Sequence, residues 1–314
     1  MYKKWGCISL VLALILVLLA GCAQPVQTQQ GKLHIVATLF PQYDFARQIA
    51  GNRAQVTMLL PVGMDTHSYD PTPADILSIQ NADLFVYTGE QMESWAHRIV
   101  AGVDAEQLQV VDISKGITLL QVTHNAQETE EQEQDGHDHT YDPHIWTSPK
   151  NAQIMVQTLL EAMCAADVEN ADYYKENAER YIGQLETLDQ QFREIVQQGK
   201  RNKILFASRF ALLYFTTEYG LQYQAAFDSC TSESEAGTQA VAGLINTVQA
   251  EDIPVVYYEE LSEPKIAKTV CEETGCGMLL FHSCHNISKE EQQSGATYLS
   301  LMQQNAEHLK EGLQ

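Results

Sequence analysis

Residues 171–198 read ADYYKENAERYIGQLETLDQQFREIVQQ, and this stretch divides the chain into two similar halves. Apolar side chains recur in it at steps of three and four residues, from Tyr174 to Ile195, which predicts one long amphipathic helix. At 1.5 Å per residue such a helix would be about 40 Å long. We therefore expect a stiff helix that joins two lobes. A coiled-coil seam is the alternative, although a helix of this kind has no evident partner within the chain.

Short runs rich in β-branched and aromatic residues occur on both sides of this stretch, with amphipathic segments between them. Four runs precede the long helix and four follow it: 33–38, 55–60, 84–87, 108–113, 203–208, 222–227, 254–258 and 277–281. Strands that alternate with helices in this way form largely parallel sheets. The sequence therefore predicts an α/β fold of two lobes, each with a mostly parallel four-stranded sheet flanked by helices.

The N-terminus has the features of a lipoprotein leader. Lys3 and Lys4 precede an apolar run at 8–20, which is too short to span a membrane, since a spanning helix needs about twenty residues. The run ends in LAGC at 19–22, the small-residue box before an acylated cysteine. We expect cleavage before Cys22 and a protein anchored outside the cytoplasm by lipid on Cys22. An uncleaved signal anchor and an ordinary secretory signal are the alternatives.

The expected domain boundaries follow from these patterns. Residues 22–32 are rich in Gln and lack periodicity, which is typical of a flexible tether. The predicted order is a signal peptide at 1–21, the tether at 22–32, an N-terminal lobe at 33–170, a linker helix at 171–199 and a C-terminal lobe at 200–314. We expect a monomer.

The chain is strongly acidic, with a formal net charge of −22 at pH 7. Such a surface repels nucleic acid and anionic lipid and attracts cations, so a nucleic-acid partner is not expected. Acidic surfaces are common and do not identify a ligand by themselves. Five cysteines remain beyond the leader, an odd number, so at least one thiol is free or metal-bound. They are Cys164, Cys230, Cys271, Cys276 and Cys284, and their pairing stays open.

Residues 124–141 differ in composition from the rest of the chain. The segment holds six acidic residues and three histidines, His124, His137 and His139, without an apolar pattern. It cannot bury enough surface to order itself, which predicts a mobile acidic loop within the N-terminal lobe. The loop is either a solvated insertion or a weak auxiliary site that gathers metal, because histidine and aspartate supply suitable ligands.

A histidine stands shortly before a predicted helix start in two places. After His67, Thr72 is suited to cap a helix, Pro73 to be its first residue and Asp75 to complete a capping box. A lone loop histidine is usually a surface residue.

The second place repeats this arrangement. After His144 in DPHIWTSP, Ser148 and Pro149 would be the cap and the first helical residue. In parallel α/β sheets such loops lie at the carboxyl ends of strands, where ligands bind. Two histidines in the same setting, flanked by rigidifying prolines, favour a shared site.

These motifs together resemble the ZnuA/TroA-like (cluster A-I) metal-binding proteins of ABC transporters, over nearly the whole chain beyond the leader. The motifs are FPQYDF at 40–45, YDPTP at 69–73, YTG at 87–89, DPHIW at 142–146 and YGL at 219–221. The resemblance implies two α/β lobes, a rigid connecting helix and one metal ion between the lobes. It also implies capture of a divalent metal and its delivery to an ABC permease with its ATPase subunit.

Family members hold the metal with two side chains from each lobe, and the resemblance places His67 and His144 as the first pair. The second pair differs here. Arg209 stands where the family has a third His or a Glu, and Arg has no lone pair to donate. His282 stands where the family has its closing Asp, and imidazole is a suitable ligand.

One ligand is therefore missing from the second lobe, unless water or another group closes the site. Residues at the predicted strand ends are candidates: Cys230, Glu259, Glu260, Cys284 and His285. Cys230 and His285 are favoured, although each also fits a structural role, as a buried thiol or as a loop histidine bonded to backbone. Arg209 is expected to pair with Glu235 or Glu260 and to help hold the lobes together.

Imidazole and thiolate ligands favour Zn²⁺ over Mn²⁺, which prefers carboxylate oxygens, so zinc is expected and manganese is the alternative. The chain is not expected to be an enzyme. A zinc hydrolase would need an open coordination position beside a general base, and the HExxH and GxSxG motifs are absent, as is a phosphate-binding GxxxxGK[ST] loop. The alternative function is a surface adhesin of the same fold with lost or altered metal binding, which the arginine at 209 makes conceivable.

Overall fold

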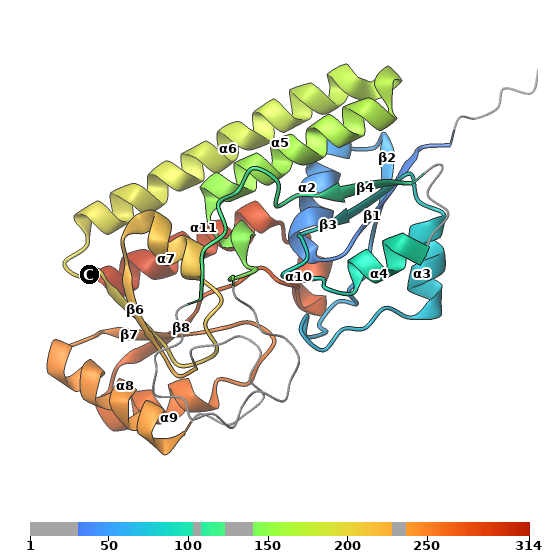
Figure 1. Ribbon diagram of the computed structural model, residues 1–314. Coiled ribbons are helices and arrows are strands. Elements are labelled where there is room, and N and C mark those ends of the chain that lie inside the picture. The colour runs from blue at the N-terminus through green and yellow to red at the C-terminus, as the bar shows by residue number, and fades with distance from the viewer. Residues whose placement is uncertain (1–30, 103–107, 123–140, 228–236) are drawn as a thin grey trace, which may run out of the picture. The chain divides into compact units, whose positions relative to one another are not determined.

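Two four-stranded parallel sheets form the framework of residues 33–314 (Figure 1). This computed structural model describes residues 31–102, 108–122, 141–227 and 237–314. The first sheet has the order β2-β1-β3-β4 and the second the order β6-β5-β7-β8. All pairs within both sheets are parallel. The predicted fold class is confirmed.

The strands agree closely with the predicted runs, mostly ending one or two residues earlier. They are β1 (Leu33–Ala37), β2 (Ala54–Met58), β3 (Leu84–Tyr87), β4 (Gln109–Asp112), β5 (Lys203–Phe206), β6 (Gln222–Ala225), β7 (Val255–Tyr258) and β8 (Gly277–Leu280). The second run shows why the ends differ. Leu59 and Leu60 follow β2 and are buried, and their backbone N–H groups donate to the carbonyls of Ala37 and Thr38. Apolar residues thus continue beyond the strand because the loop behind it is also buried.

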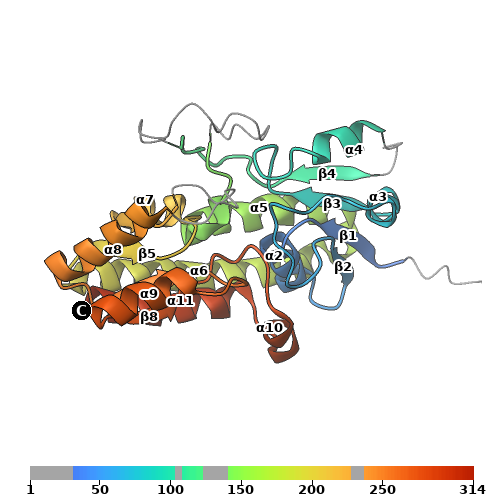
Figure 2. The same cartoon turned by 90° about the horizontal axis from the view of Figure 1, so that it is seen from below.

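Helices cover the sheets, and the chain ends in a helix (Figures 1 and 2). They are α2 (Phe40–Ala50), α3 (Pro73–Gln80), α4 (Ala96–Gly102), α5 (Pro149–Ala166), α6 (Ala171–Gln198), α7 (Leu213–Tyr219), α8 (Thr238–Glu251), α9 (Lys265–Thr274), α10 (Lys289–Ser294) and α11 (Tyr298–Leu313). Both predicted helix starts are confirmed. Thr72 and Asp75 form a capping box before α3, and the Ser148 side chain accepts from the Asn151 N–H at the start of α5.

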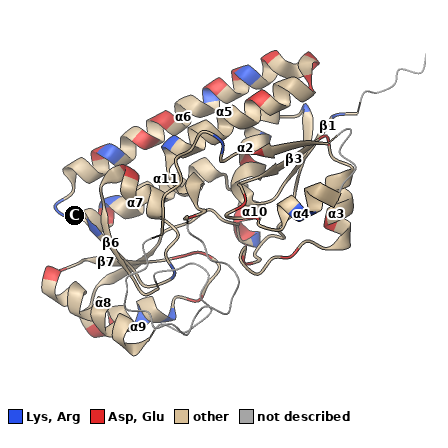
Figure 3. Cartoon of the chain, viewed as in Figure 1, with Lys and Arg blue, Asp and Glu red and all other residues tan. Residues whose placement is uncertain are grey.

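The long helix α6 is confirmed, and it contacts helices of both lobes. Its 28 residues pack against α2 on the side of the first sheet and against α7 and α11 on the side of the second. The predicted apolar stripe, from Tyr174 to Ile195, is buried as far as Phe192, and Ile195 is half-buried. The expectation that this helix lacks a partner in the chain is wrong, because α5 packs along it. Charged positions recur along α5 and α6, as Figure 3 shows, and complement the buried stripe.

One apolar cluster runs through both lobes. It includes Ile35 and Val86 from the first sheet, Phe206 and Tyr257 from the second, and Leu185 from α6 between them. Because tightly packed interiors resist deformation, this shared core limits how far the two sheets can separate. None of the helices among the described residues is both long and apolar enough to cross a membrane.

Candidate metal centre

Three imidazoles from distant parts of the sequence meet at one point. His67 lies between β2 and α3, His144 lies just before the short 3-10 helix η2 (Ile145–Thr147), and His285 lies between β8 and α10. Each offers one ring nitrogen, and these three atoms lie within 4.8 Å of one another. The ring centroids of His67 and His144 are 5.8 Å apart, those of His67 and His285 5.5 Å, and those of His144 and His285 4.6 Å. Such a cluster can hold a divalent cation.

Asp142 fixes the ring of His144. Its Oδ1 atom accepts from the His144 backbone N–H at 2.8 Å and lies 2.9 Å from Nδ1 of the ring. A carboxylate only accepts hydrogen bonds, so Nδ1 carries the proton and the lone pair is on Nε2. His144 is fully buried, which holds this orientation. The arrangement is typical of a metal-binding histidine with a carboxylate behind it.

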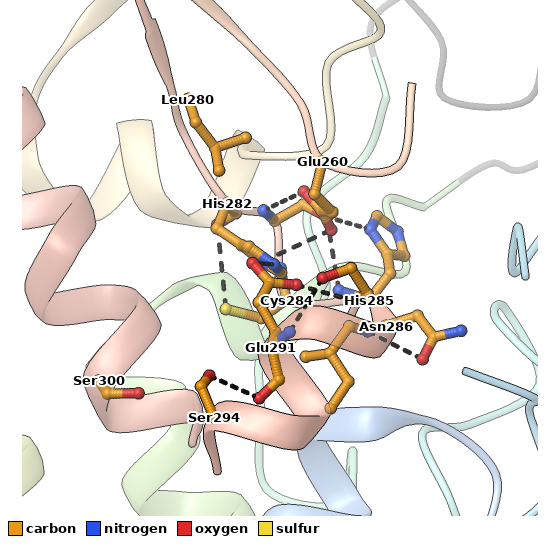
Figure 4. Close-up of polar contacts among 12 residues, drawn as sticks. Glu260, Leu280, His282, Cys284, His285, Asn286, Glu291, Ser294 and Ser300 are labelled. Carbon is orange, nitrogen blue, oxygen red and sulfur yellow. Dashed lines mark hydrogen bonds and ion pairs between the residues drawn. The ribbon is translucent and has the colours of Figure 1, made fainter. Parts of the chain in front are cut away.

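Ser283 and Glu260 fix the ring of His285 in a similar way. Glu260 and His285 are labelled in Figure 4. The Ser283 hydroxyl donates to Oε1 of Glu260 at 2.5 Å, and the Ser283 backbone N–H donates to Oε2 at 2.8 Å. The same hydroxyl contacts Nδ1 of His285. The hydroxyl group of a serine can donate one hydrogen bond, and that of Ser283 donates it to Glu260. In the contact with His285, Nδ1 of the ring is therefore the donor and the Ser283 oxygen the acceptor. The lone pair of His285 is therefore on Nε2.

The first lobe holds the loop that carries His285. The side-chain amide of Asn286 donates to the carbonyls of Pro61, at 2.7 Å, and Met64, at 3.0 Å. Nε1 of Trp146 donates to the carbonyl of Ser283 at 2.8 Å. These bonds cross between the lobes, so the position of His285 depends on contacts that are distant in sequence.

Two of the ring nitrogens are buried without a hydrogen-bond partner, namely Nε2 of His67 and Nε2 of His285. A buried polar atom left without a partner costs about 1–3 kcal/mol, so such atoms call for an explanation. The loop of His67 is held by Asp65, whose Oδ1 accepts from the N–H groups of His67 and Ser68. A cation shared by the imidazoles would satisfy both nitrogens.

The environment favours the neutral form of His285. Burial, followed by the positive charges that His144 and His67 would carry, holds the pKa of His285 well below its usual range. Only a neutral imidazole has the lone pair that binds a metal. His285 is therefore able to bind a cation near neutral pH.

Arg209 connects the two lobes beside this cluster. Its Nη2 lies 2.9 Å from Oδ2 of Asp65 in the first lobe, and its Nε lies 2.9 Å from Oε1 of Glu259 in the second. Burial, the largest single cause, would raise the pKa of Asp65, but the charge and hydrogen bond of Arg209, together with those from His67, lower that pKa. Arg209 therefore bridges the two lobes, and its predicted role in holding them together stays a prediction. Of the two expected partners, Glu260 binds Ser283, and Glu235 lies outside the described residues.

A cavity of about 150 Å³ opens beside the cluster. Both lobes line it, with Asp65 and His67 from the first and Arg209, Glu259 and His285 from the second. Burial raises the pKa of Glu259 to about 7, although Arg209 acts in the opposite direction. The cavity thus gives a small cation access to the imidazoles past ionisable groups.

His282 is not brought into the cluster. The Cys284 backbone N–H donates to its Nδ1 at 2.9 Å, and its Nε2 lies 3.4 Å from Oε1 of Glu291 (Figure 4). Both ring nitrogens therefore face partners in the second lobe, and the side chain is 1% exposed. Cys284 has a positive φ of 63°, and this left-handed turn directs His285 toward the cluster instead of His282.

Several predicted residues lie outside the described part of the chain. Cys230, the three histidines of the acidic loop (His124, His137 and His139) and the lipidation site Cys22 belong to this group, and their roles stay predictions. The supporting residues Asp142 and Ser283 were not assigned a role from the sequence, and Glu260 was considered only as a candidate ligand and as a partner of Arg209. Asp142 had a usable signal, since it stands two residues before His144 in the same DPHIW motif.

The chain matches known proteins over nearly its full length. The family described as "ZnuA: Zinc-uptake complex component A periplasmic" matches residues 35–312. The high-affinity zinc uptake system protein ZnuA of Bacillus subtilis (strain 168) is 32% identical over 318 residues, covering 100% of this chain and 99% of that protein. The zinc-binding lipoprotein AdcA of Streptococcus pneumoniae (strain ATCC BAA-255 / R6) is 30% identical over 305 residues, and the match spans only 60% of its length.

A solved structure shares the fold. The crystal structure of the Zn(II)-bound ZnuA-like domain of Streptococcus pneumoniae AdcA has a TM-score of 0.75 and 28% sequence identity, covering 90% of this chain and 99% of that chain. The two-lobed architecture built from residues 33–314 is thus that of a known metal-binding domain.

Proposed function

Since this chain belongs to the ZnuA family of periplasmic zinc-uptake components, we propose that it captures one Zn²⁺ ion outside the cytoplasm and delivers it to an ABC permease. His67, His144 and His285 are the proposed ligands. The chain itself performs no chemical reaction on the ion. Its task is to replace the water around Zn²⁺ with imidazole nitrogens and to hold the ion until transfer.

The observation that carries this proposal is the convergence of the three rings. Their candidate ligand atoms lie within 4.8 Å of one another. Zinc binds imidazole nitrogen at about 2.0–2.1 Å, so two nitrogens on one tetrahedral ion are about 3.4 Å apart. The ligand atoms must therefore approach one another by about 1.4 Å at most. The shared apolar core, which limits separation of the sheets, fits a small local closure of this kind.

Three imidazoles make Zn²⁺ the favoured ion. Nitrogen ligands suit zinc, whereas manganese prefers carboxylate and water oxygens. Three protein ligands leave one position of a tetrahedral ion, and we propose that water fills it. The nearby carboxylates of Asp65 and Glu259 are held by Arg209, which keeps them from the ion. An ion with one water ligand can be released more readily than one enclosed by four side chains.

Charge behind the ligands balances the ion. Asp142 accepts from His144, and Glu260 is linked to His285 through Ser283. Asp142 makes the imidazole of His144 a better electron donor, and Glu260 does the same for His285. Each also fixes the lone pair of its imidazole on Nε2. Neutral ligands thus bind the dication, with negative charge one hydrogen bond away at Asp142 and two hydrogen bonds away at Glu260.

Delivery and location follow from the family. We propose that the loaded chain docks, as a monomer, on a membrane permease whose partner ATPase powers transport. We further propose that lipid on Cys22 keeps it near that permease. The acidic composition, with a net charge of −22, would draw cations toward the protein. The histidines of the acidic loop, 124–141, would add a weak gathering site.

An adhesin role is less well supported than metal capture. Both relatives described above carry names that refer to zinc. The substitution at Arg209, which made an adhesin conceivable, leaves three imidazoles together among the described residues. The geometry therefore favours metal binding.

Elemental analysis of chelator-washed protein after addition of zinc tests the proposal. We expect about one zinc per chain in the parent. The variant with His67, His144 and His285 all replaced by Ala should retain none. Equal zinc content in the two proteins would show that the ion binds elsewhere, and absence of zinc from both would remove the capture function.

A further inference from the structure

Two cysteines of the second lobe face each other at the junction of α9 and β8. Cys271 lies in the last turn of α9, and Cys276 directly precedes β8. Their Sγ atoms are 3.3 Å apart. A disulfide has an S–S distance of about 2.05 Å, so closure requires the sulfurs to approach by only about 1.2 Å. Small side-chain rotations can supply this without moving the strand.

The local backbone favours the same approach. Gly275 has a φ of 78° and ends α9, and its N–H donates to the carbonyl of Cys271 at 2.8 Å. The Cys276 N–H donates to Oγ1 of Thr274 at 3.3 Å. Both side chains are partly buried against the small apolar cluster of the second lobe. The turn thus holds the two thiols side by side.

A metal does not account for this pair. A structural zinc site needs four ligands, and the pair supplies two sulfurs. Within the described residues, the group of three or more His, Cys, Asp or Glu side chains able to share an ion is the histidine cluster, which contains neither cysteine. Proteins outside the cytoplasm fold where disulfides form and persist. The family to which this chain belongs is periplasmic.

We propose that Cys271 and Cys276 are a modification site, joined by a disulfide bond in the exported protein. A small organic disulfide is a sufficient oxidant. One cysteine, as a thiolate, attacks a sulfur of that disulfide and expels one thiol. The second cysteine attacks the resulting mixed disulfide and expels the other, so the two cysteines lose two hydrogens and the oxidant becomes two thiols.

The bond is structural and is not repeatedly reduced and re-formed. It ties the end of α9 to the start of β8, which is an edge strand of its sheet. Burial raises the pKa of Cys271 to about 12, and a thiol of high pKa is a poor leaving group, so reduction of the closed bond by exchange is slow. The bond forms independently of zinc, because neither cysteine belongs to the metal centre.

Peptide mapping of the 314-residue protein tests the proposal. The folded protein is exposed to oxidised glutathione, its remaining thiols are alkylated, and it is digested at Glu and, separately, at Lys and Arg. Glu272 and Glu273 lie between the two cysteines, so a bond between them holds two Glu-digest peptides together. We expect to find this linked pair of peptides and to lose it on reduction. Peptides that contain Cys164 and Cys284 should not be linked to other peptides through those cysteines.

Thermal unfolding supplies the second readout. The oxidised parent should unfold about 4 °C above the reduced parent, because a short closed loop restricts the unfolded chain. The C271S/C276S double variant should show no dependence on reductant, whereas C164S should behave as the parent does. Alkylation of both Cys271 and Cys276 after oxidation, or linkage of either one to another cysteine, overturns the proposal. Because the mapping uses the parent protein, it does not depend on the variants folding.

Discussion

The guanidinium of Arg209 lies 2.9 Å from the carboxylate of Asp65, and this ion pair joins the second lobe to the first beside the histidine cluster. A fixed positive charge next to a cation site is unusual. It is tolerated here because Asp65 and Glu259 both pair with it. The arginine therefore withholds two carboxylates from the ion and lowers the local attraction for a dication.

Replacing Arg209 by Gln should accordingly raise zinc affinity. The change removes a unit positive charge near the ion and frees two carboxylates, so we expect about a tenfold or larger increase in affinity. Competition against a chromophoric chelator measures it. Arg193→Gln is the matched control, because Arg193 also pairs with two carboxylates, those of Asp189 and Glu218, but does not line the cavity. Unchanged or weaker binding in Arg209→Gln would show that the arginine supports the site.

The two candidate histidines of the second lobe should behave differently. His285→Ala removes a proposed ligand, and we expect a loss of affinity greater than the 10–100-fold that is typical for outer partners of a metal site. His282→Asn keeps an acceptor for the Cys284 N–H and should bind zinc within a few-fold of the parent. Calorimetric titration with zinc, after circular dichroism has shown both variants folded, compares them. The reverse order of effects would restore His282 as the ligand.

The supporting carboxylates should matter for affinity and not for stoichiometry. Asp142→Asn weakens the electron donation to His144, and Glu260→Gln does the same for His285 through Ser283. Each variant should still bind one zinc, with affinity lower by about 10–100-fold. Glu263→Gln, at an exposed ion pair with Lys268, is the control. If neither Asp142→Asn nor Glu260→Gln differs from this control, the carboxylates have no part in binding.

Glu93 should make stability depend on pH. Burial raises the pKa of this carboxyl to about 7, despite hydrogen bonds from Thr38, Thr88 and Gly89 that act in the opposite direction. The pKa in the fold therefore exceeds the ordinary value of 4.5. Between pH 4.5 and 7 the Glu93 carboxyl therefore holds a proton in the folded protein that it has lost in the unfolded chain. The resulting contribution to the free energy of unfolding is full below about pH 4.5 and is lost as the pH rises through 7.

Glu93→Gln should remove this dependence. The difference in free energy of unfolding between variant and parent should change by on the order of 3 kcal/mol, in favour of the variant, from pH 5 to pH 8. Urea unfolding of zinc-free protein at both pH values measures it. Glu90→Gln, at a largely exposed neighbour, should give a constant difference. A constant difference for Glu93→Gln as well would mean that the carboxyl titrates normally.

Local signals in the sequence predicted much of the fold. Thr72, Pro73 and Asp75 define the start of α3 through their own chemistry, and Ser148 with Pro149 does so for α5. The stripe from Tyr174 onward defines α6. The helix α5 beside it was not foreseen as its partner, because pairing between helices depends on the packing of both lobes.

The candidate site was predictable only where the ligands follow a local pattern. His67 and His144 stand before recognisable helix starts, whereas His285 depends on the left-handed turn at Cys284 and on bonds from Asn286 to the first lobe. Similarly, the choice between Glu259 and Glu260 as partner of Arg209 depends on how the chain leaves β7. Adjacent residues in extended chain point to opposite sides, and the sequence does not show which side faces the cleft.

Anomalous diffraction at the zinc absorption edge, from crystals of the zinc-loaded protein, tests the central claim most directly. We predict one strong peak, about 2.0–2.1 Å from Nε2 of each of His67, His144 and His285. A peak bound by His282, or one bound by fewer than all three of these rings, would contradict the proposed site.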